Sequence, residues 1–123
     1  MPISIAYQSS GVSGAIIGSN PYSISATTTS TSAAVASTGV FQAYIDFSNM
    51  GTSDEYLVEV WEKTHANASQ QVLDSWIYSY PLAKPLAVLP AIVLSEGWDV
   101  RITRIGGATS TAIGIPYSVR KIA

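Results

Sequence analysis

The residues of this chain that could perform acid–base or nucleophilic chemistry are few and scattered. His65, the only histidine, lies in the polar stretch THANAS, with no accompanying motif. A catalytic triad needs a base beside its nucleophile, so we interpret His65 as a solvated loop residue. The eight carboxylates could supply the acid–base pair of a glycoside hydrolase, but no spacing singles out two of them. The sequence therefore predicts a protein that is not an enzyme.

Metal and cofactor sites are not indicated either. The sequence contains no cysteine, which excludes thiolate metal ligands and disulfides. A calcium site favours several acids within a few residues of one another. The adjacent pair Asp54–Glu55 is too small a cluster to indicate such a site. Neither a G-x-G-x-x-G fingerprint nor a P-loop is present. We expect no cofactor and no bound metal.

Aromatic side chains give a second kind of candidate site. In SWIYSY, the residues Trp76, Tyr78 and Tyr80 alternate and share one face if the segment is a strand. Such a row could stack sugar rings, as carbohydrate-binding modules do. The alternative is that the rings fill a core or an interface, where Trp and Tyr bury large areas. We favour this second interpretation.

The stretch EGWDVRITRI, residues 96–105, places acids and an aromatic directly after a turn. The turn SEG leaves Glu96 solvated, and a strand begins after it. We therefore interpret this stretch as architecture, with its outward residues available for cross-strand pairing or for a partner. Alternation gives an inward row and an outward row: Trp98, Val100 and Ile102 against Asp99, Arg101 and Thr103.

Alternation with a period of two recurs along the whole chain, whereas helical spacing does not. With turn signals such as SNMGTSD between the segments, this pattern predicts an all-β fold: a single antiparallel β-sandwich, jelly-roll or immunoglobulin-like, of seven to eight strands. Pro116 suggests that the last strand is at an edge or bulged. The expected strands are 3–8, 40–47, 55–63, 72–80, 91–94, 98–105 and 112–121. Further rows that share one face are Ile3, Ile5 and Tyr7; Phe41, Ala43, Ile45 and Phe47; Tyr56, Val58 and Val60; and Ile113, Ile115, Tyr117 and Val119.

The composition points to an assembly. Only 11% of the 123 residues are charged, against about 25% in an average soluble domain. Hydrophobic residues make up 47%, and Ser, Thr, Gly and Ala fill the deficit in charge. Much of such a surface is expected to meet another subunit. The alternative is a neutral monomer coated with hydroxyl groups.

Nucleic-acid and membrane partners are not expected. The net charge is −2, and the basic residues are too scattered to form the stripe that would neutralise phosphates. The most apolar run, PLAKPLAVLPAIVL, carries Lys84 and three prolines, which a membrane helix would not tolerate. The stretch MPISIAYQSS lacks the features of a signal peptide. We expect a soluble protein that is not secreted by the usual route.

The segment 9–39 fits a sandwich less well than the rest of the single domain, residues 1–123. It is rich in Gly, Ser, Thr and Ala, yet it contains Ile16 and Ile17. We prefer to interpret it as a loop followed by a Thr-rich strand. The alternative is an N-terminal arm or extended loop that becomes ordered on a neighbouring subunit, with Ile16 and Ile17 in the contact.

Several motifs resemble those of small virion proteins of tailed bacteriophages. They are DFSNMGTSDEYLVEVWEK, LPAIVLSEG, GWDVRITRIGG and YSVRK, and together they cover roughly residues 40–121. Pro116 departs from the pattern in the final strand. The resemblance implies a β-sandwich that decorates or cements a capsid.

The same resemblance implies partners and a location. The partners would be the major capsid protein and copies of the chain itself, as a homotrimer or alternatively a dimer. The location would be the outer capsid surface, after synthesis in the host cytoplasm. The alternative function is a carbohydrate- or receptor-binding module of a tail or fibre, using the face of Trp76, Tyr78 and Tyr80.

Overall fold

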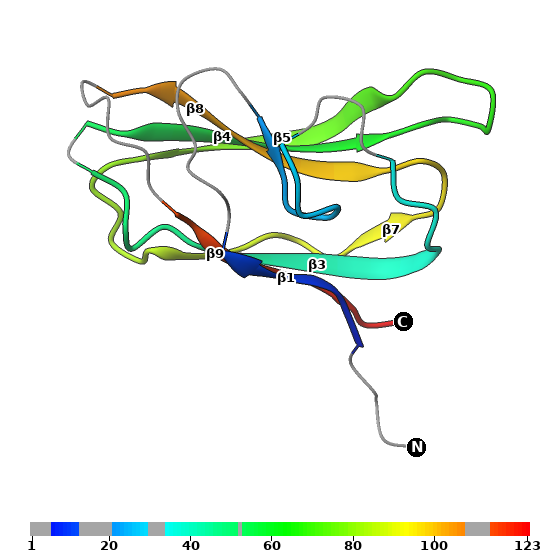
Figure 1. Cartoon of the computed structure of the whole chain (residues 1–123), viewed down its shortest axis with the longest axis horizontal. Coiled ribbons are helices and arrows are strands. Elements are labelled where there is room, and N and C mark those ends of the chain that lie inside the picture. Colours follow the sequence, from blue (N-terminus) through cyan, green and yellow to red (C-terminus); the bar gives the residue numbers. More distant parts are fainter. Residues whose placement is uncertain (1–5, 13–20, 30–33, 52, 108–113) are drawn as a thin grey trace.

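A computed structural model describes residues 6–12, 21–29, 34–51, 53–107 and 114–123. In these residues the protein is all-β, and nine strands form two antiparallel sheets that pack as two layers (Figure 1). The predicted antiparallel β-sandwich is confirmed, with nine described strands instead of seven to eight. They are β1 Ala6–Val12, β2 Tyr22–Ser23, β3 Gly39–Asp46, β4 Glu55–Glu62, β5 Gln71–Ser79, β6 Leu86–Val88, β7 Ile92–Leu94, β8 Asp99–Gly106 and β9 Pro116–Lys121.

The five-stranded sheet has the order β1-β9-β3, after which β6 and β7 both pair with β3. Residues 86–88 pair with one end of β3 and residues 92–94 with the other. Pro90 lies between them and has no N–H to donate, so it divides what would otherwise be one edge strand. The sequence pattern predicted only the second of these two strands.

The last strand is not at an edge, which corrects the expectation drawn from Pro116. β9 lies between β1 and β3 and pairs with both. Pro116 is its first residue, a position where a sheet tolerates the missing N–H. The proline therefore marks where the strand begins.

The four-stranded sheet has the order β2-β8-β4-β5. Its inner face and that of the five-stranded sheet enclose the core. Trp98 is fully buried; its ring packs against Phe41 at 4.5 Å between centroids, and its indole N–H donates to the Ser37 carbonyl oxygen at 2.8 Å. The row of Ile3, Ile5 and Tyr7 is not confirmed as an inward row, because Tyr7 is 62% exposed and the other two residues lie outside the described residues. The described members of the other inward rows are buried: Phe41, Ala43, Ile45, Phe47, Tyr56, Val58, Val60, Trp98, Val100, Ile102, Ile115, Tyr117 and Val119. Ile113 lies outside the described residues.

Parts of segment 9–39 belong to the sandwich. Residues 9–12 are in β1 and pair with β9, and β2 pairs with β8. Val35 forms an isolated bridge with Trp98, with backbone N···O distances of 2.7 and 3.1 Å. Ile16 and Ile17, the predicted contact residues, lie outside the described residues.

Candidate functional site

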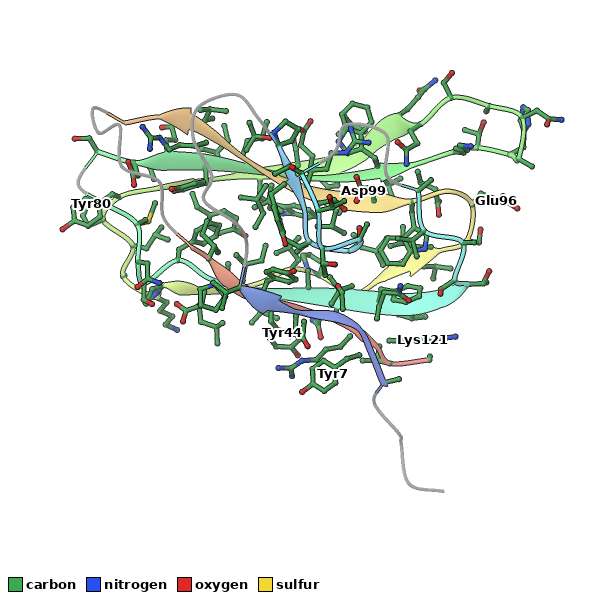
Figure 2. All side chains as sticks on the ribbon, in the orientation of Figure 1. Tyr7, Tyr44, Tyr80, Glu96, Asp99 and Lys121 are labelled. Carbon is green, nitrogen blue, oxygen red and sulfur yellow. The ribbon has the colours of Figure 1, made fainter. Side chains whose placement is uncertain are left out.

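The acid of the stretch EGWDVRITRI is completely buried on the outer side of the four-stranded sheet. Asp99 faces away from the core, as the alternation predicted, but its exposed fraction is zero. Its Oδ1 accepts hydrogen bonds from the hydroxyls of Ser23 and Ser25, and its Oδ2 accepts one from the Arg101 Nε at 2.6 Å. Figure 2 labels Asp99 within the body of the molecule. The carboxylate was expected either to pair within the sheet or to contact a partner, and it pairs within the protein.

Arg101, expected to contact a partner, is held in the same cluster. Only 6% of it is exposed, and its Nη2 donates to the Gln70 Oε1 at 2.8 Å. Its guanidinium carbon lies 4.6 Å from the centre of the Trp61 ring, within cation–π range. Because a buried charge needs both a counter-charge and hydrogen bonds, this arrangement is typical of a structural ion pair. Arg101 therefore offers little surface to a partner.

The aromatic row of SWIYSY does not form one exposed platform. Trp76 and Tyr78 are partly buried and pack against the core, and the Tyr78 ring lies 4.9 Å from that of Phe47. Burial raises the pKa of Tyr78. Tyr80, just beyond β5, is 45% exposed. The favoured interpretation, that these rings pack inside the protein, agrees with this arrangement for Trp76 and Tyr78.

A second buried polar cluster lies at the start of β4. Asp54 and Tyr56 are buried, and the Asp54 Oδ2 accepts the Gly51 N–H at 2.7 Å. Burial, with the nearby Asp54 carboxylate adding to it, raises the pKa of Tyr56 to about 12. Arg104 is also buried, and its charge acts in the opposite direction. A tyrosine held neutral in this way is suited to packing rather than to proton transfer near neutral pH.

The other carboxylates and the histidine do not converge on a site. Glu96 lies in an exposed turn, as expected. His65 is exposed, and its Nδ1 accepts the Asn67 N–H at 3.2 Å. Among the residues that the structure describes, no three His, Asp or Glu side chains are grouped so that they could hold a metal ion. In the same residues, no helix is long and apolar enough to cross a membrane.

The outer side of the five-stranded sheet is the main exposed feature. Arg120 lies over the ring of Tyr44 at 3.7 Å and near that of Tyr7 at 5.6 Å, and the Tyr44 hydroxyl donates to Gln42. Figure 2 shows Tyr7 and Tyr44 projecting from the same side of this sheet. Exposed apolar side chains lie on the same side of this sheet. We call the whole set the apolar face: Tyr7, Val12, Tyr44, Leu86, Val88, Val93 and Arg120.

The orientation of the apolar face follows from alternation in β6 and β7. Ala87 and Leu94 are buried, so their neighbours Leu86, Val88 and Val93 must point outward. Val93 is 71% exposed, the largest value among the exposed apolar residues. Sequence reasoning missed this surface. A strand with one solvated face alternates apolar and polar residues. The available signal was that LAVLPAIVL is apolar on both faces of such a strand.

Comparison with known proteins adds no further assignment. No protein-family model matches the chain, and no curated protein matches it. The resemblance to virion proteins of tailed bacteriophages therefore stays a prediction. The argument for function comes from the exposed side chains of the apolar face.

Proposed function

We propose that this protein is a non-enzymatic structural protein of a tailed-bacteriophage virion that binds the major capsid protein and stabilises the shell from outside. The observation that carries the proposal is the apolar face, on which Leu86, Val88 and Val93 are 48–71% exposed. Exposed apolar side chains gathered on one side of a sheet are typical of surfaces that contact another protein. The low charge content, 11%, supports the same role because charged side chains are depleted at the centres of interfaces.

The physical basis of the stabilisation is burial repeated at many points of the shell. Each Å² of apolar surface removed from water contributes roughly 25 cal/mol. Arg120, stacked on Tyr44, adds one positive charge to this side of the sheet, and Asp46, opposite Leu86, adds one negative charge. A protein that bridges several capsid subunits gains further, because after the first contact the second one is intramolecular. Modest individual contacts can therefore hold a cement protein firmly on the particle.

The proposal is tested with capsids that lack the protein. Without it, particles should release their DNA at a lower temperature than complete particles, and adding the purified protein back should restore their stability. The double variant Val88→Lys with Val93→Lys should fail to restore it, because two buried charges would disrupt the contact.

Ile105→Lys provides the matched control for this experiment. Ile105 is 45% exposed on β8, in the other sheet, so its substitution should leave binding intact. Equal stability of particles with and without the protein would contradict the cementing role. Binding of the double variant at wild-type affinity would contradict the use of the apolar face.

A further inference from the structure

β5 is a long strand at the edge of the four-stranded sheet that the described residues form. It has nine residues and, among the described strands, pairs only with β4. Val72, Leu73 and Ile77 are 45–61% exposed, and the only charge along the strand is that of Asp74. An exposed and apolar edge of this length is a template for pairing with another strand.

The other described edges are protected in ways that β5 is not. β2 has two residues, and β6 and β7 have three each, with Pro85 and Pro90 beside them. β1 contains Gly11 and a register shift between Tyr7 and Ser9. Short strands, prolines and bulges are common means of preventing contact between edges. β5 has one bulge, opposite Val60 and Trp61, and leaves residues 74–79 in regular register.

Hydrogen bonds show which backbone groups of β5 face the open side. The Tyr80 N–H donates to the Asp54 carbonyl oxygen at 2.9 Å, so the even-numbered residues of this part of the strand are directed towards β4. The Ser75 N–H instead donates to the Asp74 carboxylate at 2.8 Å. The backbone groups of Ser75, Ile77 and Ser79 therefore point to the free edge.

We propose that β5 pairs antiparallel with β5 of a second copy of this chain. Pairing centred on Ile77 uses the part of the strand in regular register and sets Ser75 opposite Ser79 of the other copy, with the two Ile77 side chains opposite each other. Asp74 then stands opposite Tyr80 of the other copy, so the two carboxylates are not directly paired. The Asp74 carboxylate releases the Ser75 N–H, which becomes a donor in the new ladder.

The symmetry of this contact defines the assembly. Two identical strands paired antiparallel are related by a twofold axis, which closes the assembly at a dimer. The dimer alternative is thereby chosen over the trimer that the phage resemblance implied. The contact lies on the four-stranded sheet, whereas the apolar face belongs to the five-stranded sheet. The dimer does not rest on the capsid-binding role, and each can fail without the other.

Sedimentation velocity over a range of concentrations tests the proposal on the purified protein. The wild type should shift from monomer to dimer as concentration rises. Ser75→Pro, which removes a donor at the free edge, and Ile77→Lys, which places charge in the contact, should stay monomeric. Asp74→Ala, which frees the Ser75 N–H, should dimerise at a lower concentration. Val93→Lys, at an exposed apolar site in the other sheet, should dimerise like the wild type.

Thermal melts of dilute samples show whether each variant is folded. If Ser75→Pro fails to fold, Ile77→Lys still tests the proposal. Amide exchange gives a second readout: the Ile77 and Ser79 amides should become more protected as wild-type concentration rises. The proposal is overturned if the wild type stays monomeric at the highest concentration reached or forms a trimer. A dimer that persists in Ile77→Lys would overturn it as well.

Discussion

The Asp99 cluster, on the outer side of the four-stranded sheet, and the apolar face of the five-stranded sheet treat charged and apolar residues in opposite ways. On the four-stranded sheet, Asp99 and Arg101 are 0% and 6% exposed, covered and paired with one another. On the five-stranded sheet, Val88 and Val93 are 48% and 71% exposed. Burying a charge requires a partner inside the protein, whereas exposed apolar surface gains free energy only when another molecule covers it. The first region thus stabilises the monomer, and the second is suited to a partner.

The largest effect is expected from removing the buried carboxylate. Asp99→Ala would leave the Arg101 guanidinium buried without its counter-charge, and the hydroxyls of Ser23 and Ser25 without their acceptor. The expected loss of unfolding free energy is about 3–5 kcal/mol, measured by urea denaturation.

Asp46→Ala is the matched control for that measurement. Asp46 is partly exposed on β3, and its carboxylate accepts one N–H, that of Ser48, at 2.9 Å. Its removal should lower the unfolding free energy by about 1 kcal/mol or less. Similar losses in the two variants would show that the Asp99 cluster is not a buried charge network, and the contrast between the cluster and the apolar face would no longer hold.

An intermediate effect is expected at alkaline pH. Folding raises the pKa of Tyr56 from 10.0 to about 12, so the stabilisation from its neutral form is complete below pH 10 and is lost as pH rises towards 12. At about pH 11 the loss should be about 1.4 kcal/mol, one pKa unit of linkage. Burial also raises the pKa of Tyr117 and Tyr78, in the same direction.

Tyr56→Phe isolates this contribution. The variant should lose less stability than the wild type between about pH 9 and about pH 11, as urea denaturation at each pH would report. Tyr80→Phe, on an exposed ring, should follow the wild type. If Tyr56→Phe and the wild type decline equally, ionisation of Tyr56 is not what limits alkaline stability.

The smallest effect on folding is expected on the apolar face. Val88→Thr with Val93→Thr replaces exposed methyl groups and should change the unfolding free energy by less than about 0.5 kcal/mol per site. Val58→Thr makes the same chemical change in the core, where Val58 is fully buried, and should lower stability by about 1–3 kcal/mol. If the two surface changes destabilise as much as Val58→Thr, the apolar face is part of the fold and is not free to bind.

The central strands could be predicted from alternation because one of their faces is fully buried. In β3, β4 and β8 the pattern identified the buried row correctly. The strand β2 was missed, since two residues give no measurable period. The strand β6 was missed as well, although β7, also of three residues, was predicted from the apolar run AIVL. The edge position predicted from Pro116 was wrong, because local chemistry cannot show whether a proline begins a strand or interrupts it.

The polar cluster and the binding surfaces depend on contacts that alternation does not encode. Asp99 was correctly assigned to the outer side, but its burial depends on Ser23, 76 residues away in the sequence. The openness of β5 depends on which strands become neighbours, which a sequence pattern leaves undetermined. Trp76 and Tyr78 were correctly favoured as packing residues because their alternation matches a strand with one inner face.

The central claim, that the apolar face binds a capsid, is tested most directly by cryo-electron microscopy of intact particles. The account predicts density for this sandwich on the outer shell, with Val88 and Val93 against the major capsid protein. In the same map, β5 should lie away from the shell and beside β5 of a second copy. A map in which the sandwich is absent from the shell, or presents Val88 and Val93 to solvent, would contradict the account.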